Sequence, residues 1–503
     1  MKNNIIFINV CLIIILLFGI TIGCYQAIIN PLTSDTVNPG LYAHDFWKGN
    51  QQFFVPVNDP YPIDYLISVI TVPLFDYGAH AVVVEGIIVY LIIILLAFLI
   101  VKHLSGTTAG LVVAAIISNS PYQSLQYLVS PVYHGTTIMI ILGIILVYYI
   151  IEDIIKLGVI AFLMMLGALN DSLIVPIFIV PFILLNLIKY KEKNSWIMIL
   201  ASIAGLAVFM FKQGSLWPNG LYLVNVGGIT NIIGANLQPS MIPQYVFSLV
   251  NMSGGILIIL IILGLILAWN HRESRDLVFL CIMGGICMFF GFVFMYSSGG
   301  DLGRWLYPIP IMGMLAISTG IKDKKTMAYL IVPVIIFLLL TTNTIRITVE
   351  DHNINEKDYE LITYLHSINV THAYANYWAS NLLDYLDPSQ TLRIAPVEPV
   401  NGSIQYLYLQ SSMDWTKWGW PTNNSPTIDN DPVLIVYTPG DPLYEYAQTI
   451  NKNTPPIATY SYKNYDVPGC ASDTIIIYKY NTTIPAWPIE SFQQFQSQGV
   501  KPV

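Results

Sequence analysis

Charged side chains are scarce in this sequence. Asp, Glu, Lys and Arg make up 10% of its 503 residues, hydrophobic residues make up 55%, and the mean hydropathy is +0.61. Uninterrupted apolar runs of about 17–25 residues, the length needed to cross a bilayer, recur along the first two thirds of the chain. A soluble protein could not hide so many such runs. The composition therefore predicts a polytopic α-helical membrane protein.

Cysteine is also rare. The five cysteines form neither a disulfide framework nor a metal-binding spacing. The sequence lacks the GxxxxGK[ST], HExxH and GxSxG motifs, and its first loop lacks the DxD that would hold the metal of a nucleotide sugar. We therefore expect no cofactor, no metal ligands and no nucleotide donor, while a role for a divalent metal stays open.

The apolar runs predict about eleven transmembrane helices. We place them at residues 5–28, 80–101, 107–118, 136–151, 157–169, 173–188, 196–211, 246–269, 277–296, 305–321 and 327–342. The third and fifth are short for a full crossing of the bilayer.

Basic residues orient the predicted bundle. One side carries most of them, namely Lys2, Lys102, Lys156, Lys189, Lys191, Lys193, Arg272, Arg275, Lys322, Lys324 and Lys325. The other side carries Lys48, Lys212 and Arg304. The positive-inside rule makes the first side cytoplasmic. We expect a multi-pass cell-membrane protein with a cytoplasmic N-terminus and, because the number of spans is odd, an extracytoplasmic C-terminus.

The composition changes after residue 342, where Asn, Asp, Tyr, Trp and Pro become more frequent. Strand-like runs at 391–396, 433–437 and 474–480 and a helical pattern at 357–368 predict an α/β or α+β domain. The predicted organisation is thus a transmembrane domain over 1–342, with 30–62 as its first exterior loop, and an extracytoplasmic domain over 343–503.

The first exterior loop is the most informative stretch, because it concentrates carboxylates in a chain that avoids charge. Asp35 lies a few residues beyond the first helix, where a general base could take a proton from an acceptor hydroxyl. Its Ser-Asp-Thr context also fits an Asx turn or the N-cap of a following helix, which the residue taken alone favours. His44 and Asp45, on a helix expected at 37–48, either bind sugar or phosphate or are solvated residues at the membrane interface.

Three further polar residues lie at the predicted exterior rim. Asp171, at a turn between two spans, either orients a donor headgroup or caps the helix that starts at Ser172. His134 opens the fourth span and either reaches a phosphate or is an ordinary interfacial histidine. Arg304 either binds a lipid-linked phosphate through its fork of donors or snorkels beside Asp301.

Together these features resemble the integral-membrane glycosyltransferases of the GT-C fold, above all those of the protein O-mannosyltransferase and aminoarabinose-transferase kind. The resemblance rests on five segments, which are Ser34-Asp35, Asp-Pro-Tyr-Pro at 59–62, residues 170–176, Gly-Arg-Trp-Leu-Tyr-Pro at 303–308 and residues 372–381. The fourth segment is similar to an RYLxP segment of the family. The fifth is similar to a GYAxYWxAN segment. It covers nearly the whole chain in layout. The chain departs from the pattern at Trp305, where the family usually has Tyr, in having no second acid directly beside Asp35, and in lacking WWDYG.

The resemblance implies a transferase that uses a polyprenyl- or dolichyl-phosphate sugar and passes the sugar to a glycan, lipid or protein acceptor. In that interpretation Asp35 is the general base, and Arg304 and His134 hold the donor phosphate. The expected partners are this donor, the acceptor and the lipid bilayer, and not nucleic acid. The remaining substrate-binding candidates are His44, Asp45, Asp171, Tyr377 and Trp378. The two aromatic rings either face sugar or belong to a core.

The alternative function is a non-enzymatic transporter or sensor with a large exterior domain. Transporters tend to place ionisable groups at the bilayer midplane, often in matched halves. This sequence shows no matched halves, and its charges fall at the exterior rim. The sequence therefore favours a transferase.

Overall fold

The computed structural model describes residues 2–30, 32–49, 62–75, 78–151, 154–192, 194–211, 241–253, 265–266, 268–269, 271, 274–295, 306–319, 355–407, 425, 427–428, 431–438, 440–463 and 474–488. These residues form two compact units. One holds residues up to 28 and the described residues from 85 to 319, and the other holds the described residues from 29 to 84 and from 355 to 488.

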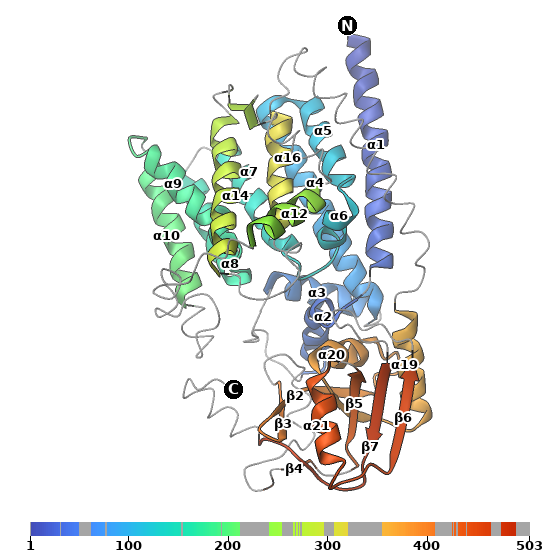
Figure 1. The fold of residues 1–503 in the computed structure, drawn as a ribbon. Helices are drawn as coiled ribbons and strands as arrows, with labels where there is room; N and C mark the ends of the chain where they lie inside the picture. Colours follow the sequence, from blue (N-terminus) through green and yellow to red (C-terminus); the bar gives the residue numbers. More distant parts are fainter. Residues whose placement is uncertain are drawn as a thin grey trace. The chain divides into compact units, whose positions relative to one another are not determined.

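The first unit is helical (Figure 1). Its helices are α1 Lys2–Ile29, α4 Ala79–Ser105, α5 Thr107–Ser118, α6 Tyr122–Leu128, α7 Gly135–Ile150, α8 Ile154–Asn170, α9 Val180–Ile188, α10 Ser195–Phe211, α12 Met241–Ser253, α14 Arg275–Met295 and α16 Pro308–Thr319. Helix α8 packs against α7 and α10, and α14 packs against α9 and α16.

Two of these helices are long and apolar enough to cross a membrane, Ile5–Ile29 within α1 and Ala79–Ser105. Several others are apolar but shorter than a full crossing requires. The helix expected at 107–118 is α5, with the same bounds. The number of spans stays a prediction, because residues 254–264 and 320–342 lie outside the described residues.

The span expected at 173–188 is not a uniform α-helix. It begins with the π-helical turn η1, Val175–Ile179, and continues as α9. Proline lacks a backbone N–H and crowds the carbonyl one turn earlier. Pro176 and Pro181 therefore interrupt the regular hydrogen-bond ladder, and a π-bulge is one way in which a helix absorbs such a break.

Close packing in the helical unit requires a glycine at position 86 on α4. A Cβ added to Gly86 would lie 1.9 Å from the backbone oxygen of Val129. Backbone atoms cannot rotate away as a side chain can. The two segments therefore approach this closely only because residue 86 has no side chain.

We predict that Gly86→Ala destabilises the helical unit by about 3 kcal/mol, since the backbone of α4 or of residue 129 must shift. Gly158→Ala on α8 is the matched control, because a Cβ there meets nothing within 4 Å. Thermal unfolding of the purified protein in detergent measures both. Equal unfolding midpoints for the two variants would contradict the packing argument.

The second unit is built on a six-stranded mixed sheet. The strand order is β3 (Ser403–Tyr406), β2 (Arg393–Val400), β1 (His372–Ala375), β5 (Val433–Thr438), β7 (Thr474–Lys479) and β6 (Ala458–Lys463). Strands β2, β1 and β5 are parallel, whereas β3, β7 and β6 pair antiparallel with their neighbours. Two short strands, β4 Thr427–Ile428 and β8 Ile484–Pro485, form a separate pair.

Helices cover both faces of this sheet (Figure 1). They are α2 Ser34–Trp47, α19 Glu356–Ser367, α20 Tyr377–Leu386 and α21 Pro442–Ile450, and α3 Pro62–Leu74 packs against α2. Successive strand residues point to opposite faces. In β5, Ile435 packs with α19 and α20, while Leu434 packs with α21. The result is a three-layer α/β arrangement.

Helix α2 belongs to this second unit, whereas the sequence analysis grouped residues 30–62 with the transmembrane domain. Val37 and Leu41 of α2 share one hydrophobic core with Leu382 of α20. The apolar face of α2 is thus buried against the C-terminal part of the chain. Sequence distance from the C-terminal domain concealed this relation.

Candidate functional site

Asp35 lies in the first turn of α2. The residue that caps this helix is Thr33, whose side-chain oxygen accepts from the amide of Thr36 at 3.4 Å, while the Thr36 hydroxyl accepts from the amide of Thr33 at 2.8 Å. This reciprocal pair is a capping box. The alternative interpretation of Asp35 as the N-cap is therefore wrong. A carboxylate in the first turn is instead favoured by the helix dipole.

A zipper of four side chains joins α2 to α20, and Asp35 is its end. Asn381 donates through Nδ2 to Oδ1 of Asn38 at 2.6 Å, and Asn38 donates through Nδ2 to the Tyr377 hydroxyl at 2.8 Å. Tyr377 in turn donates to Oδ1 of Asp35 at 2.6 Å. We call these four residues the α2–α20 zipper. It holds one oxygen of the carboxylate in a defined place.

The Tyr377 hydroxyl is fixed as a donor. Burial, the nearby Asp35 carboxylate and the hydrogen bond to it raise the pKa of Tyr377 well above its ordinary value. The phenol therefore keeps its proton throughout the physiological range. Because Asn38 donates to the same oxygen, the Tyr377 proton is directed towards Asp35.

Tyr377 and Trp378, predicted as substrate-binding residues, lie at the start of α20. Both are half-buried, and their rings meet edge-on with centroids 5.3 Å apart. The Trp378 ring packs against the hydrophobic core, and its backbone oxygen accepts from the Ser34 hydroxyl at 2.8 Å. The structure thus places both residues beside α2, next to Asp35.

His44 and Asp45 are not solvated surface residues, which was one of the two alternatives raised by the sequence. Their exposed fractions are 9% and 1%. His44 Nε2 lies 3.1 Å from Oε1 of Gln390. Helix α2 is packed by α3 and α20. The side chains of His44 and Asp45 are therefore enclosed.

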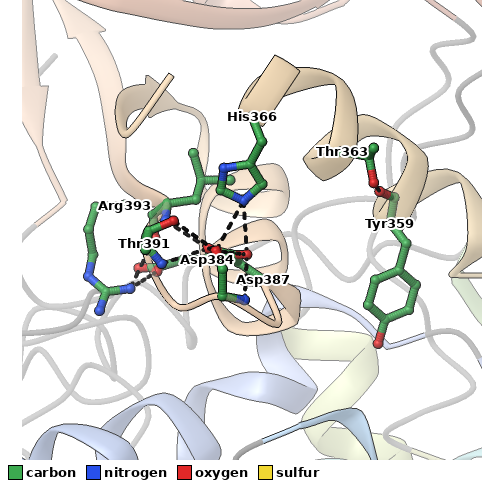
Figure 2. A network of polar contacts seen from close by, with 9 residues as sticks. Tyr359, Thr363, His366, Asp384, Asp387, Thr391 and Arg393 are labelled. Atoms are coloured by element: carbon green, nitrogen blue, oxygen red, sulfur yellow. Dashed lines mark hydrogen bonds and ion pairs between the residues drawn. The ribbon is translucent and has the colours of Figure 1, made fainter. Parts of the chain in front are cut away.

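Two contacts between charged side chains anchor the C-terminal end of α20 (Figure 2). Arg393 of β2 donates to Asp384 at 3.0 Å, and His366 of α19 lies 3.0 Å from Oδ1 of Asp387. Asp384 belongs to α20, and Asp387 is its C-cap residue. Helix α20 is therefore anchored to β2 and α19 at the end that lies away from Asp35.

Asp387 organises the turn that leaves α20. Its carboxylate accepts from the amides of Ser389, Thr391 and Leu392 at 3.0, 2.8 and 2.7 Å, and from the Ser389 hydroxyl. Burial acts to raise the pKa of Asp387. The hydrogen bonds from the Leu392 amide, His366 and Ser389 outweigh it, so the pKa lies below the ordinary value of 3.8.

A lowered carboxyl pKa gives a stability contribution that is present above the ordinary pKa and is lost as the pH falls through the lowered folded-state value. We predict that Asp387→Asn destabilises the second unit by about 2 kcal/mol at pH 7, because three amides lose a charged acceptor. The difference from wild type should shrink below about pH 3.8. Hydrogen exchange of α20 amides in the full chain at pH 7 and pH 3 measures this. Asp431→Asn, at an exposed position, is the control. A difference that does not change with pH would contradict the assignment.

The first unit contains a separate buried polar cluster around Asp171. Nδ1 of His134 lies 2.6 Å from Oδ2 of Asp171, and the Thr137 hydroxyl donates to the same oxygen at 2.7 Å. The Leu173 amide donates to Oδ1 at 2.9 Å, so Asp171 caps a turn; the helix expected to start at Ser172 starts after this turn, with Ile174 as the N-cap of η1. The exposed fractions of His134 and Asp171 are 1% and 2%. The structure brings these two predicted residues into direct contact.

The backbone beside this cluster is strained. Val132 and His134 have φ of 68° and 66°, in the left-handed region that non-glycine residues seldom adopt. The intervening Tyr133 accepts a short hydrogen bond from the Tyr307 hydroxyl through its carbonyl. The Tyr307 ring stacks on the Tyr127 ring, with the two ring centroids 5.8 Å apart. Strain of this kind persists only where surrounding contacts enforce it, and it is often found at functional sites.

We predict that His134→Ala costs several-fold more stability than Thr137→Val. The first change leaves a buried carboxylate without the imidazole that lies 2.6 Å from its Oδ2, at a cost of about 3 kcal/mol. The second removes one neutral donor, at a cost of about 1 kcal/mol. Chemical unfolding in detergent micelles compares the two. A larger loss for Thr137→Val would show that His134 is not the main partner of Asp171.

Arg304 lies outside the described residues, so its predicted contact with a donor phosphate stays a prediction. Tyr307, from the same 303–308 segment, is described and contacts Tyr133. Within the described ranges, no group of three or more His, Cys, Asp or Glu side chains is placed to hold a metal ion.

Asn38, Asn381, Thr137 and Tyr307 take part in these contacts but were not predicted as site residues from the sequence. The sequence spacing indicates part of this arrangement. Asp35 and Asn38 are three residues apart and Tyr377 and Asn381 are four apart, so the two residues of each pair lie on one face of a helix. No local pattern indicated that the two faces meet.

The chain matches no protein-family model and no curated protein. Among solved structures, its fold is similar to that of ArnT from Cupriavidus metallidurans in the apo state. The TM-score is 0.54 at 9% identity, over 98% of this chain and 99% of ArnT. This end-to-end likeness establishes a GT-C-like membrane fold, in agreement with the fold predicted from the sequence.

Two structures of the Archaeoglobus fulgidus oligosaccharyltransferase are more distant. The complex with Zn and sulfate gives a TM-score of 0.42 at 13% identity, over 76% of this chain and 62% of that protein. The form tethered to an acceptor peptide containing the NVT sequon gives a TM-score of 0.45 at 11% identity, over 76% of this chain and 63% of that protein. This chain thus spans less than two thirds of the oligosaccharyltransferase.

Proposed function

We propose that this protein is a membrane glycosyltransferase that moves a sugar from a polyprenyl- or dolichyl-phosphate donor to an acceptor hydroxyl. The observation that carries the proposal is the likeness to ArnT over the full length of both chains, because a transporter or sensor would not be expected to share that architecture. The held carboxylate of Asp35 supplies the chemical group that such a reaction needs.

In the proposed reaction, Asp35 takes the proton of the acceptor hydroxyl as its oxygen attacks the anomeric carbon. The bond between that carbon and the lipid phosphate breaks, the configuration inverts, and the lipid phosphate departs with the bonding electron pair. A positioned general base contributes about 10²–10⁴-fold to such a step. To take the proton, Asp35 acts as a carboxylate, and one of its oxygens, Oδ1, also accepts from the Tyr377 hydroxyl.

The departing phosphate gains negative charge and needs a fixed cation. Arg304 and His134 are the residues proposed to meet it. His134 is enclosed and held at Nδ1 by Asp171, so in this proposal Asp171 orients the imidazole instead of touching the donor itself. The buried positions of His44 and Asp45 suit a role in shaping α2 around Asp35.

The proposal is tested with purified full-length protein in liposomes, radiolabelled polyprenyl-phosphate sugars and cell-envelope acceptors. Wild type should release lipid phosphate and label the acceptor, and Asp35→Asn should lower turnover by about 10²–10⁴-fold, since the amide cannot accept the proton. The control is Glu360→Gln on α19, which changes an equivalent charge elsewhere in the second unit. Turnover in wild type that survives unchanged in Asp35→Asn would remove Asp35 from the mechanism, and no turnover with any donor would reject the transferase.

A further inference from the structure

The α2–α20 zipper has a fixed hydrogen-bond polarity. The Tyr377 hydroxyl accepts a hydrogen bond from Nδ2 of Asn38 and donates one to Oδ1 of Asp35. Turning the Asn38 amide round would set its nitrogen against the donor nitrogen of Asn381, and turning Asn381 would set its oxygen against the acceptor oxygen of Asn38. A carboxylate only accepts, so with Asp35 as a carboxylate Tyr377 must donate to it, Asn38 must donate to Tyr377, and Asn381 must donate to Asn38.

The last hydrogen bond of the zipper is of the strong kind. It is an O–H donating to a carboxylate at 2.6 Å, a length typical of charge-assisted bonds, which are roughly twice as strong as neutral ones. An aspartate in the first turn of a helix otherwise has free choice of rotamer. A donor from a second helix restricts that choice.

The helix that supplies this donor is itself held in place. Asp384 and Asp387 at its C-terminal end are bound by Arg393 and His366, and Leu382 packs in the core beside the sheet. Ser34 of α2 also donates to the Trp378 carbonyl at 2.8 Å. Tyr377 is therefore presented to Asp35 from a rigid support, which is the arrangement that precise placement of a reactive group requires.

We infer that Tyr377 is a positioning residue for Asp35, so that the reactive carboxylate on α2 is held in register by α20, from the C-terminal part of the chain, through the α2–α20 zipper. The inference rests on the proposed function for its catalytic consequence. It gives Tyr377 a role different from stacking on a sugar ring, because its hydroxyl is committed to Asp35. It also gives α20, from the C-terminal part of the chain, a role in placing the reactive carboxylate.

The first variant is Tyr377→Phe, which keeps the ring and removes the donor. Turnover (kcat) should fall about 10- to 100-fold, the range seen when a supporting hydrogen bond to a reactive group is lost, while KM for the donor stays within twofold. The control is Tyr462→Phe, which removes another tyrosine-to-carboxylate bond of 2.6 Å, to Glu360, in the same unit. An unchanged kcat in Tyr377→Phe would overturn the inference.

The second variant is Asn38→Asp, which guards against a simple folding defect in the first. An aspartate at 38 offers the Tyr377 hydroxyl a competing acceptor and so draws its proton away from Asp35. The kcat of this variant should fall as in Tyr377→Phe, with an unfolding midpoint close to that of wild type. A full kcat in Asn38→Asp would contradict the fixed polarity.

A measurement independent of activity separates this inference from the proposed function. Water-soluble carbodiimide and glycinamide couple to accessible carboxyl groups, and mass spectrometry of the full chain reports the coupling of Asp35. At one fixed pH, Asp35 should react with carbodiimide and glycinamide at least about threefold faster in Tyr377→Phe than in wild type or in Tyr462→Phe. The reason is that the Asp35 carboxyl group has lost its hydrogen bond from Tyr377. Equal rates would overturn the positioning role, even if wild type proves to be a transferase. Faster coupling in a protein that transfers no sugar would reject only the function.

Discussion

A carboxylate in a protein of this composition must be surrounded by donors, because an apolar interior gives an unpaired charge nothing in place of water. Asp35, Asp171 and Asp387 each meet this constraint differently. Asp387 is enclosed by three backbone amides and a histidine, Asp171 by a histidine, a threonine and one amide, and Asp35 by a tyrosine that reaches it from another helix. These surroundings determine which parts of the chain must pack together.

The three environments suggest different uses. Backbone amides around Asp387 fix a turn and anchor α20, so that carboxylate is structural. The enclosed pair of His134 and Asp171 stands beside strained backbone in the helical unit and next to a segment that the resemblance associates with donor phosphate. Asp35 is half-buried and accepts from the Tyr377 hydroxyl of another helix.

Patterns local in sequence predicted much of the fold. Apolar runs located α5 and α7 to within a residue or two, and strand-like composition located β5 and β7. The π-turn before α9 was missed, because two prolines inside an apolar run do not reveal how the hydrogen bonds rearrange. The assignment of residues 30–62 to the transmembrane domain differed from the structure for another reason. What holds α2 is an apolar core and a zipper whose partners, such as Asn38 and Asn381, are 343 residues apart. Sequence pattern named Asp35 as a candidate but could not show what orients it.

A structure of the full-length protein in lipid, with a non-reactive phosphonate analogue of a polyprenyl-phosphate sugar, would show where the donor binds relative to Asp35. We expect the anomeric carbon of the analogue to lie close to the Asp35 carboxylate, with the Tyr377 hydroxyl still bound to Oδ1. An analogue bound away from Asp35, or a Tyr377 ring turned from Asp35 to stack on the sugar, would contradict this expectation.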